Sequence, residues 1–140
     1  MNGNKKLSGS GGMVWINNEE LAEVKSIELK VTGKFESFSQ CGDLAEGNTY
    51  TGWSGDGTIV MVKEKSRGIA LLAEAYKSGI MPDIKVITKL TDFSTGESER
   101  CSVEDIVLTE FSLAKFEAQG LCEEEIPLKF SKYDILEMIV

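Results

Sequence analysis

The residue types that most often carry catalysis are scarce in this chain. Its 140 residues include no histidine, which removes the commonest general base, nucleophile activator and metal ligand. The three cysteines, Cys41, Cys101 and Cys122, are odd in number and widely spaced, which argues against a disulfide framework and a CxxC-type metal site. We therefore expect three free thiols in a reducing compartment, with no local sequence that would activate one as a nucleophile.

Two short segments have residue types that occur in metal sites or in phosphate-binding loops. In a strand, Glu123 and Glu125 would share a face and could bind a hard cation, but no loop of carbonyl ligands accompanies them. Residues 52–57 (Gly-Trp-Ser-Gly-Asp-Gly) fail the spacing of both phosphate-binding loops and lead into a strand rather than a helix. The sequence thus predicts no cofactor, no metal and no catalytic residue. A carboxylate pair is the one catalytic alternative left, because 23 acids always contain some pair.

The clearest elements are two long runs of alternating character. Residues 27–36 alternate apolar or glycine positions with polar ones, and residues 49–63 form a second run rich in glycine and β-branched residues. Each run is about twice the usual strand length of 5–6 residues. A strand pair of this length would overhang the core of a small domain and expose backbone edges that invite pairing with another chain. Gly55 and Gly57 would allow another backbone or a helix to approach closely.

The remaining elements are shorter. Residues 13–16, 83–91, 97–111 and 122–130 are typical of strands, and one helix of about 13 residues ends at Gly79 ahead of Pro82. Pro127 restricts the last of these strands to an edge or to a position whose amide needs no partner. Periodicity leaves residues 133–140 open between strand and helix. The sum predicts a mainly β fold, a sandwich or barrel of about seven antiparallel strands with one flanking α-helix.

The length and the charge of the chain limit its domain number and the kinds of partner it could bind. The chain suits one domain, and neither a signal peptide nor an apolar run of the ~20 residues that span a bilayer is evident, so we expect synthesis inside the cell. Residues 1–96 carry 12 acids and 11 bases, whereas residues 97–140 carry 11 acids and 4 bases. This acidic balance disfavours binding to nucleic acid or to anionic membranes. It is consistent either with a solvated face or with a surface for a basic partner.

Several short segments of the sequence are weak signals one by one, but their order and spacing together are specific for one family. They are Ser8-Gly9 with Gly12, Glu19-Glu20-Leu21, residues 52–58, Leu71-Leu72 with Tyr76-Lys77-Ser78-Gly79 and Pro82, and residues 123–130. In these the chain resembles bacteriophage tail tube proteins, namely the XkdM-like family of PBSX-type prophage elements and related contractile tails. It departs from the family pattern in its three cysteines and in residues 38–48.

The resemblance implies a structural subunit rather than an enzyme. Such subunits form homo-hexameric rings that stack into a tube, whose hollow lumen conducts DNA or which acts as a puncturing needle. The implied partners are other copies, a tail sheath if the tail contracts, and baseplate or initiator, tape-measure and tail-terminator proteins. DNA would pass without specific binding, and no membrane is involved. The location would be the bacterial host cytoplasm during assembly, and then the tail of a virion or phage-like particle.

The resemblance also assigns roles to segments. Residues 1–12 would be a flexible N-terminal arm, and residues 13–140 a single tail-tube β domain with an assembly hairpin over about 25–63. The residues expected in contacts between subunits are Ser39, Gln40, Gly42, Asp43, Leu44, Gly47, Gly52, Gly55 and Gly57. One polar face of the hairpin would line the lumen, and its candidates are Glu28, Lys30, Thr32, Lys34, Glu36, Ser54, Asp56 and Thr58. A neutral or acidic lining would let DNA pass by repelling phosphate.

Two other functions remain open at this stage. The first is a small β-barrel module that binds a lipid-like or other small ligand, with Trp15, Trp53 and Phe35 lining its pocket. Such a module would be a stable monomer. The second is a tube subunit of a secretion system, which shares the fold but not the phage context.

Overall fold

A computed structural model describes residues 11–21, 23–39, 41–42, 44–62 and 67–139 of the chain. The predicted N-terminal arm lies outside these residues, apart from its last two positions. The described residues form one helix and nine strands: β1 (Gly12–Ile16), β2 (Glu19–Glu20), β3 (Val24–Phe38), β4 (Gly47–Val62), α1 (Arg67–Ser78), β5 (Val86–Thr91), β6 (Ser98–Glu104), β7 (Val107–Leu108), β8 (Glu123–Phe130) and β9 (Lys132–Glu137).

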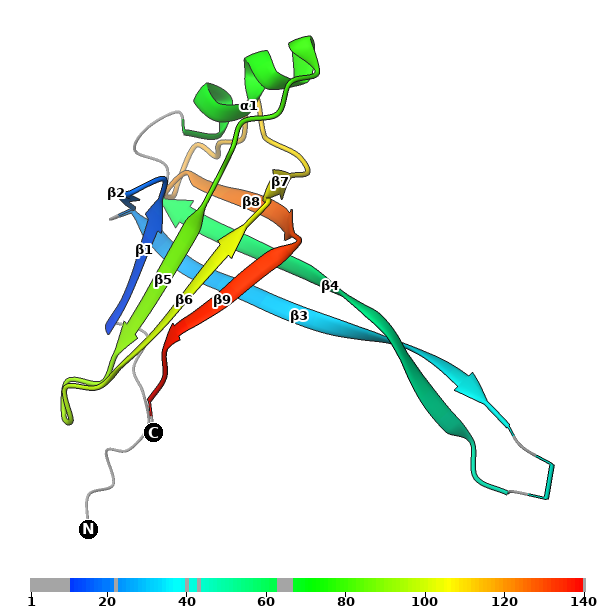
Figure 1. Cartoon of the computed structure of the whole chain (residues 1–140). Helices are drawn as coiled ribbons and strands as arrows, with labels where there is room; N and C mark the ends of the chain where they lie inside the picture. Colours follow the sequence, from blue (N-terminus) through cyan, green and yellow to red (C-terminus); the bar gives the residue numbers. More distant parts are fainter. Residues whose placement is uncertain (1–10, 22, 40, 43, 63–66, 140) are drawn as a thin grey trace.

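The strands build two antiparallel sheets that face each other (Figure 1). One has five strands in the order β2-β1-β5-β6-β9, and the other has four in the order β3-β4-β8-β7. The core lies between the sheets near α1, because the alternation of each strand turns one apolar face inward. Its buried residues are Val14, Leu21, Ile59, Met61, Leu72, Ile84, Val86, Val103, Ile106, Leu108, Ile126, Leu128 and Phe130. The predicted class, mainly β with one helix, is confirmed.

Helix α1 closes one end of the sandwich. Leu72 is buried, and the Tyr76 hydroxyl donates a hydrogen bond to the carbonyl oxygen of Leu108 at 2.5 Å. The helix ends as predicted at Gly79, which adopts φ +77° and donates its N–H to the carbonyl oxygen of Ala75. A left-handed residue at this position is a common helix terminator and favours glycine. The helix is therefore anchored to the four-stranded sheet by both apolar and polar contacts.

Strands β3 and β4 are much longer than their neighbours. They pair from Val24–Met61 down to Phe38–Gly47, whereas β8 pairs with β4 only over residues 55–62. Beyond Gly55, no third strand of the described part of the chain lies beside the hairpin, which projects away from the other strands in Figure 1. We call residues 31–38 and 47–54 the overhang. The overhang predicted from the two long alternating runs is present.

Two details of the strands differ from the sequence-based expectation. Residues 97–111 are not one strand, because the chain leaves β6 at Asp105, which adopts φ +52°, and re-enters the other sheet as β7. The tail, which periodicity left open, pairs with β6 as β9.

Pro127 lies inside the four-stranded sheet but at a place that tolerates it. The Pro127 carbonyl accepts a hydrogen bond from the Thr109 N–H at 3.2 Å, so its nitrogen faces the same side, just beyond the end of β7. The missing donor therefore breaks no bond to β4. This position matches the second of the two settings predicted for Pro127.

Candidate assembly surface

The polar face of the hairpin is formed by cross-strand pairs. Glu28 pairs with Thr58, Lys30 with Asp56 and Thr32 with Ser54, so all of these side chains share one face. The β3 members, including Lys34 and Glu36, are exposed, and the β4 members are half-buried. Ile27 and Leu29, at the intervening positions, pack against the core instead. The eight residues predicted to line a lumen do lie together and outside the core, while the lumen itself stays a prediction.

A β-bulge within the overhang shifts the alternation of the β4 side chains by one residue. Lys34 pairs with Gly52 but Phe35 pairs with Tyr50, so Thr51 is an extra residue on β4. Gly52 adopts φ +145°, and the Thr51 hydroxyl donates to the Lys34 carbonyl at 3.1 Å. Beyond the bulge, the side chains at odd positions of β4 lie on the polar face. Gly52 is thus needed for the shape of the hairpin itself.

The other face of the overhang is apolar and uncovered. Val31, Phe35 and Tyr50 are 45%, 60% and 57% exposed. The Phe35 and Tyr50 rings meet edge to face, with centroids 5.5 Å apart. Apolar side chains gathered on one uncovered face of a projecting hairpin are typical of a surface that binds another protein.

The glycines predicted for contacts between subunits have different environments. A Cβ at position 55 would lie 2.4 Å from the ring of Phe130, and one at position 57 would lie 2.5 Å from the side chain of Leu29. The close approach expected there is therefore made inside the subunit, and it accounts for both glycines without a second chain. Gly47 lies under the ring of Phe38, and Gly42 adopts φ +83° in the turn.

At the tip of the hairpin, the structure describes two of the remaining predicted contact residues. Ser39 is exposed, and Leu44 is fully exposed. Gln40 and Asp43, also predicted here, lie outside the described residues. A fully exposed leucine at the end of a projection fits a contact with another molecule, which remains a prediction.

Sequence reasoning missed several charged residues of the polar face. Lys129 pairs with Asp56, and Glu125 pairs with Val60, so β8 adds both to this face. Glu123 pairs with Val62 on the same face and is contacted there by Lys25. The charged residues of the face are then five acids (Glu28, Glu36, Asp56, Glu123, Glu125) and four lysines (Lys25, Lys30, Lys34, Lys129), a net charge of −1. Only the pairing of β8 with β4 brings them there, and no local sequence signal predicts that pairing.

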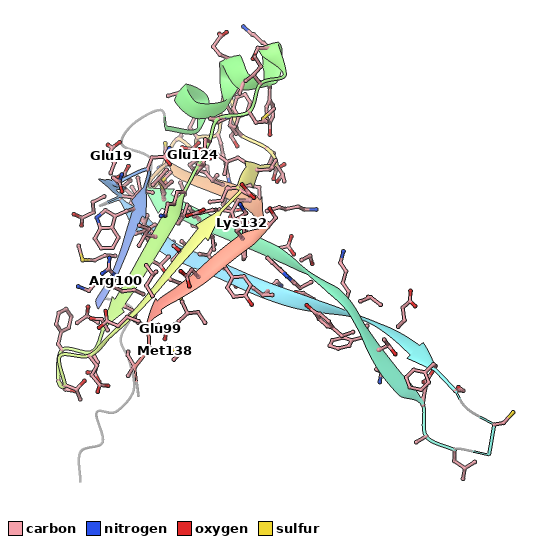
Figure 2. The ribbon with its side chains drawn as sticks, viewed as in Figure 1. Glu19, Glu99, Arg100, Glu124, Lys132 and Met138 are labelled. Atoms are coloured by element: carbon pink, nitrogen blue, oxygen red, sulfur yellow. The ribbon has the colours of Figure 1, made fainter. Side chains whose placement is uncertain are left out.

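The acidic run at the start of β8 makes structural contacts. Lys25 Nζ lies 2.7 Å from Glu123 Oε1, and this hydrogen bond and the lysine charge hold the pKa of Glu123 below its ordinary value. Glu124 points into the core and is 3% exposed, at the helix end of β8 (Figure 2). Within the described part of the chain, no group of three potential ligands could hold a metal ion, and the cysteines there are free.

The pocket predicted for a small-ligand module does not form. Trp15 lies on the face of β1 opposite buried Val14, Phe35 lies in the overhang, and Trp53 packs against the rings of Phe130 and Tyr133. The three aromatic residues thus belong to separate parts of the molecule. The prediction that they line one pocket is wrong, because the strand register places them on different faces and strands.

Comparison with known proteins decides the family. A family model described as "Phage tail tube protein" matches residues 1–137. The chain belongs to the phage tail tube protein family. Over 135 residues it is 27% identical to the phage-like element PBSX protein XkdM of Bacillus subtilis (strain 168). The aligned region covers 95% of this chain and 92% of that protein.

Solved structures of injection systems share the fold of this tail tube protein. A chain of the sheath–tube complex of the extracellular contractile injection system PVC superposes with a TM-score of 0.76 at 11% identity, covering 96% of this chain and 94% of that one. A chain of the tube-terminating cap of the anti-feeding prophage gives 0.78 at 12% identity, covering 99% and 95%. Among the described residues, no helix is long and apolar enough to cross a membrane.

Proposed function

We propose that six copies of this tail tube subunit close into a ring and that the rings stack into a hollow tube. The observation that carries the proposal is the overhang, a paired two-strand projection with one polar face and one uncovered apolar face. An isolated monomer gains nothing from such a projection, since it exposes apolar side chains and backbone edges to water. In a ring, both would be covered by neighbouring copies.

The four-stranded sheet supports a continuous inner barrel. Its two ends are β3, whose outer side pairs with no other strand of the described residues, and the two-residue strand β7 next to β8. If β3 of one copy joins the β7–β8 side of the next, the backbone groups of both edges are satisfied and closure leaves no free edge. The polar face, from Glu28 to Glu36 with its β4 partners, then lines the lumen.

The charge of that face suits the passage of DNA or service as an inert needle. Its net charge of −1 is spread over nine charged side chains on three strands. Strong binding to DNA requires several cations that neutralise phosphates together, and here acids are interspersed with the lysines. The subunit would therefore act as a mechanical conduit, with a structural rather than a catalytic role.

The expected partners follow from the family. Because related folds occur in a sheath–tube complex and in a tube-terminating cap, we include a sheath and a terminator among them, together with a baseplate or initiator and a tape-measure protein. Assembly would take place in the bacterial host cytoplasm, and the product would be the tail of a virion or phage-like particle.

Negative-stain electron microscopy of the purified protein, alone and with tail-initiation components, tests the proposal. Hollow tubes or six-fold rings are the expected result. A protein that stays monomeric at high concentration with an initiator present would refute it.

A further inference from the structure

The β-bulge of the overhang gives the hairpin a bend that its sequence could have avoided. Thr51 is the extra residue on β4, and the pairs on either side of it are Lys34–Gly52 and Phe35–Tyr50. We propose that this bulge sets the angle at which the overhang leaves its sheet, and that this angle determines how many copies close into a ring. The inference deepens the proposed function and rests on it, because it names the residues that would fix the geometry of the ring.

Two features hold the bulge in one conformation. Gly52 adopts φ +145°, a backbone conformation that residues with a Cβ rarely adopt, although a Cβ there would meet no atom of the described residues within 4 Å. The backbone conformation, and not close packing, therefore accounts for this glycine. The Thr51 hydroxyl donates a hydrogen bond to the Lys34 carbonyl oxygen at 3.1 Å, which ties the extra residue to the opposite strand.

No third strand of the described residues lies beside this bulge. Strand β8 pairs with β4 only over residues 55–62, so the hairpin is a two-stranded ribbon at Thr51. The other irregularity of the pair, at Lys25 on β3, lies beside β4 residues that also pair with β8, and a third strand therefore braces it. A bulge bends its strand and increases the local twist, and the ribbons of β3 and β4 cross part-way along the projection (Figure 1). The direction of the overhang thus depends on the few residues around Thr51.

The two faces of the overhang do not require the extra residue. If Thr51 were removed, Tyr50 would follow Gly52 directly along a regular ladder, and each would keep its present partner on β3. Adjacent residues of a strand point to opposite faces, so Tyr50 would stay on the apolar face and Gly52 on the polar face. Only the bend and the twist would change. Since designed sheets use bulges to introduce curvature and closure, the shape of the hairpin is the role left for this bulge.

A small change of angle would be enough to alter the ring. Six copies need a rotation of about 60° from one to the next, and seven need about 51°, so only about 9° separates the two rings. Six residues lead from Phe35 to Cys41 at the tip, which makes a lever of about 20 Å at ~3.3 Å per residue. A change of about 9° at the bulge would move the tip by about 3 Å, enough to lose van der Waals contact with a surface fitted to it.

Spin-label distances in the unassembled subunit test whether the bulge sets the angle. One label is placed on the native Cys41, and the other on Asp134→Cys in β9 or, in a second sample, on Lys77→Cys in α1, with the other two cysteines replaced by serine. Deletion of Thr51 should shift at least one of the two mean distances by about 3 Å. The matched control Thr51→Ser keeps the bulge and its hydroxyl and should shift neither. Two unchanged distances in the deletion variant would overturn the proposal.

The deletion variant should remain folded. Thr51 is exposed, and β4 keeps its pairs with β8 and its buried residues Ile59 and Met61. Circular dichroism and the Tm should therefore match those of Thr51→Ser. Loss of the folded core on deletion would contradict a role confined to the direction of the overhang.

Electron microscopy of tubes grown with an initiator tests whether the angle sets the ring. With the native cysteines in place, deletion of Thr51 should change the number of copies per ring or abolish closed rings, and Thr51→Ser should give six-fold tubes. Six-fold tubes of the parent diameter from the deletion variant would overturn the proposal and leave the tube function intact. Absence of tubes from the parent protein would instead refute the proposed function, and the assignment of ring size with it.

Discussion

Gly55→Ala tests whether this glycine serves the interior of the subunit. A methyl group at position 55 would lie 2.4 Å from Cε2 and 2.5 Å from Cδ2 of the Phe130 ring. Phe130 is only 5% exposed, and its ring centroid lies 6.2 Å from that of Trp53. The ring is enclosed by the core on one side and by Trp53 on the other. It can move only by displacing packed neighbours.

The expected cost follows from two opposing contributions. Overpacking a core in this way costs about 1–3 kcal/mol. Replacing a glycine that has an ordinary φ by alanine returns about 0.4–1 kcal/mol, because the unfolded chain loses freedom. The midpoints of the two ranges give a net loss of about 1.3 kcal/mol, which lowers Tm by about 3–6 °C in a chain of this length.

Thermal unfolding of the unassembled subunit, followed by circular dichroism, measures this shift. Gly33→Ala is the matched control. Its methyl group would lie 2.8 Å from the ring of Phe35, but that ring is 60% exposed and can swing into solvent. We expect its Tm to stay within about 2 °C of the parent. A Tm for Gly55→Ala at or above that of the parent would refute the reasoning.

Two further substitutions probe the start of β8. The contact with Lys25 keeps the pKa of Glu123 below 4.5, so it stabilises the fold above that pH and is lost as the pH falls through the folded-state pKa. Lys25→Met should therefore lower Tm at about pH 7, and this loss should shrink as the pH falls from 4.5 toward about 2. A loss that stays the same over that range would contradict the reasoning. Glu124 has a buried Oε2 with no hydrogen-bond partner among the described residues and lies opposite Met61. Glu124→Met should raise the free energy of unfolding by about 1–3 kcal/mol in urea titrations, and a loss of stability would show that the carboxylate has a partner.

The hairpin was predictable because its signal is local and long. Strict alternation over residues 27–36 predicts a two-faced strand, and the glycines of residues 52–57 extend the second strand rather than ending it. The helix end at Gly79 was predictable for the same reason, since a left-handed glycine followed by Pro82 is a local stop signal.

The features that the sequence did not predict depend on pairing between strands that are far apart in the chain. Val103 and Ile106 are three residues apart, which breaks the period of two, and Asp105 turns the chain between sheets at that point. In the tail, the bulge at Leu136 disturbs the alternation of β9, so no single period fits. The contributions of Glu125 and Lys129 to the polar face depend on a register between strands about 70 residues apart, which no local pattern contains.

The shortness of β7 has a consequence for when tubes grow. This strand covers two residues of β8, and Pro127 then removes the next donor, while the free side of β3 spans fifteen residues. Two copies that meet along these unequal sides gain few backbone hydrogen bonds, and such an encounter complex is short-lived. Copies would become stable only when several are held in place at once and the circle is complete. Growth would then begin where a template aligns the first ring, and newly made subunits could accumulate to a high level beforehand without spontaneous polymerisation.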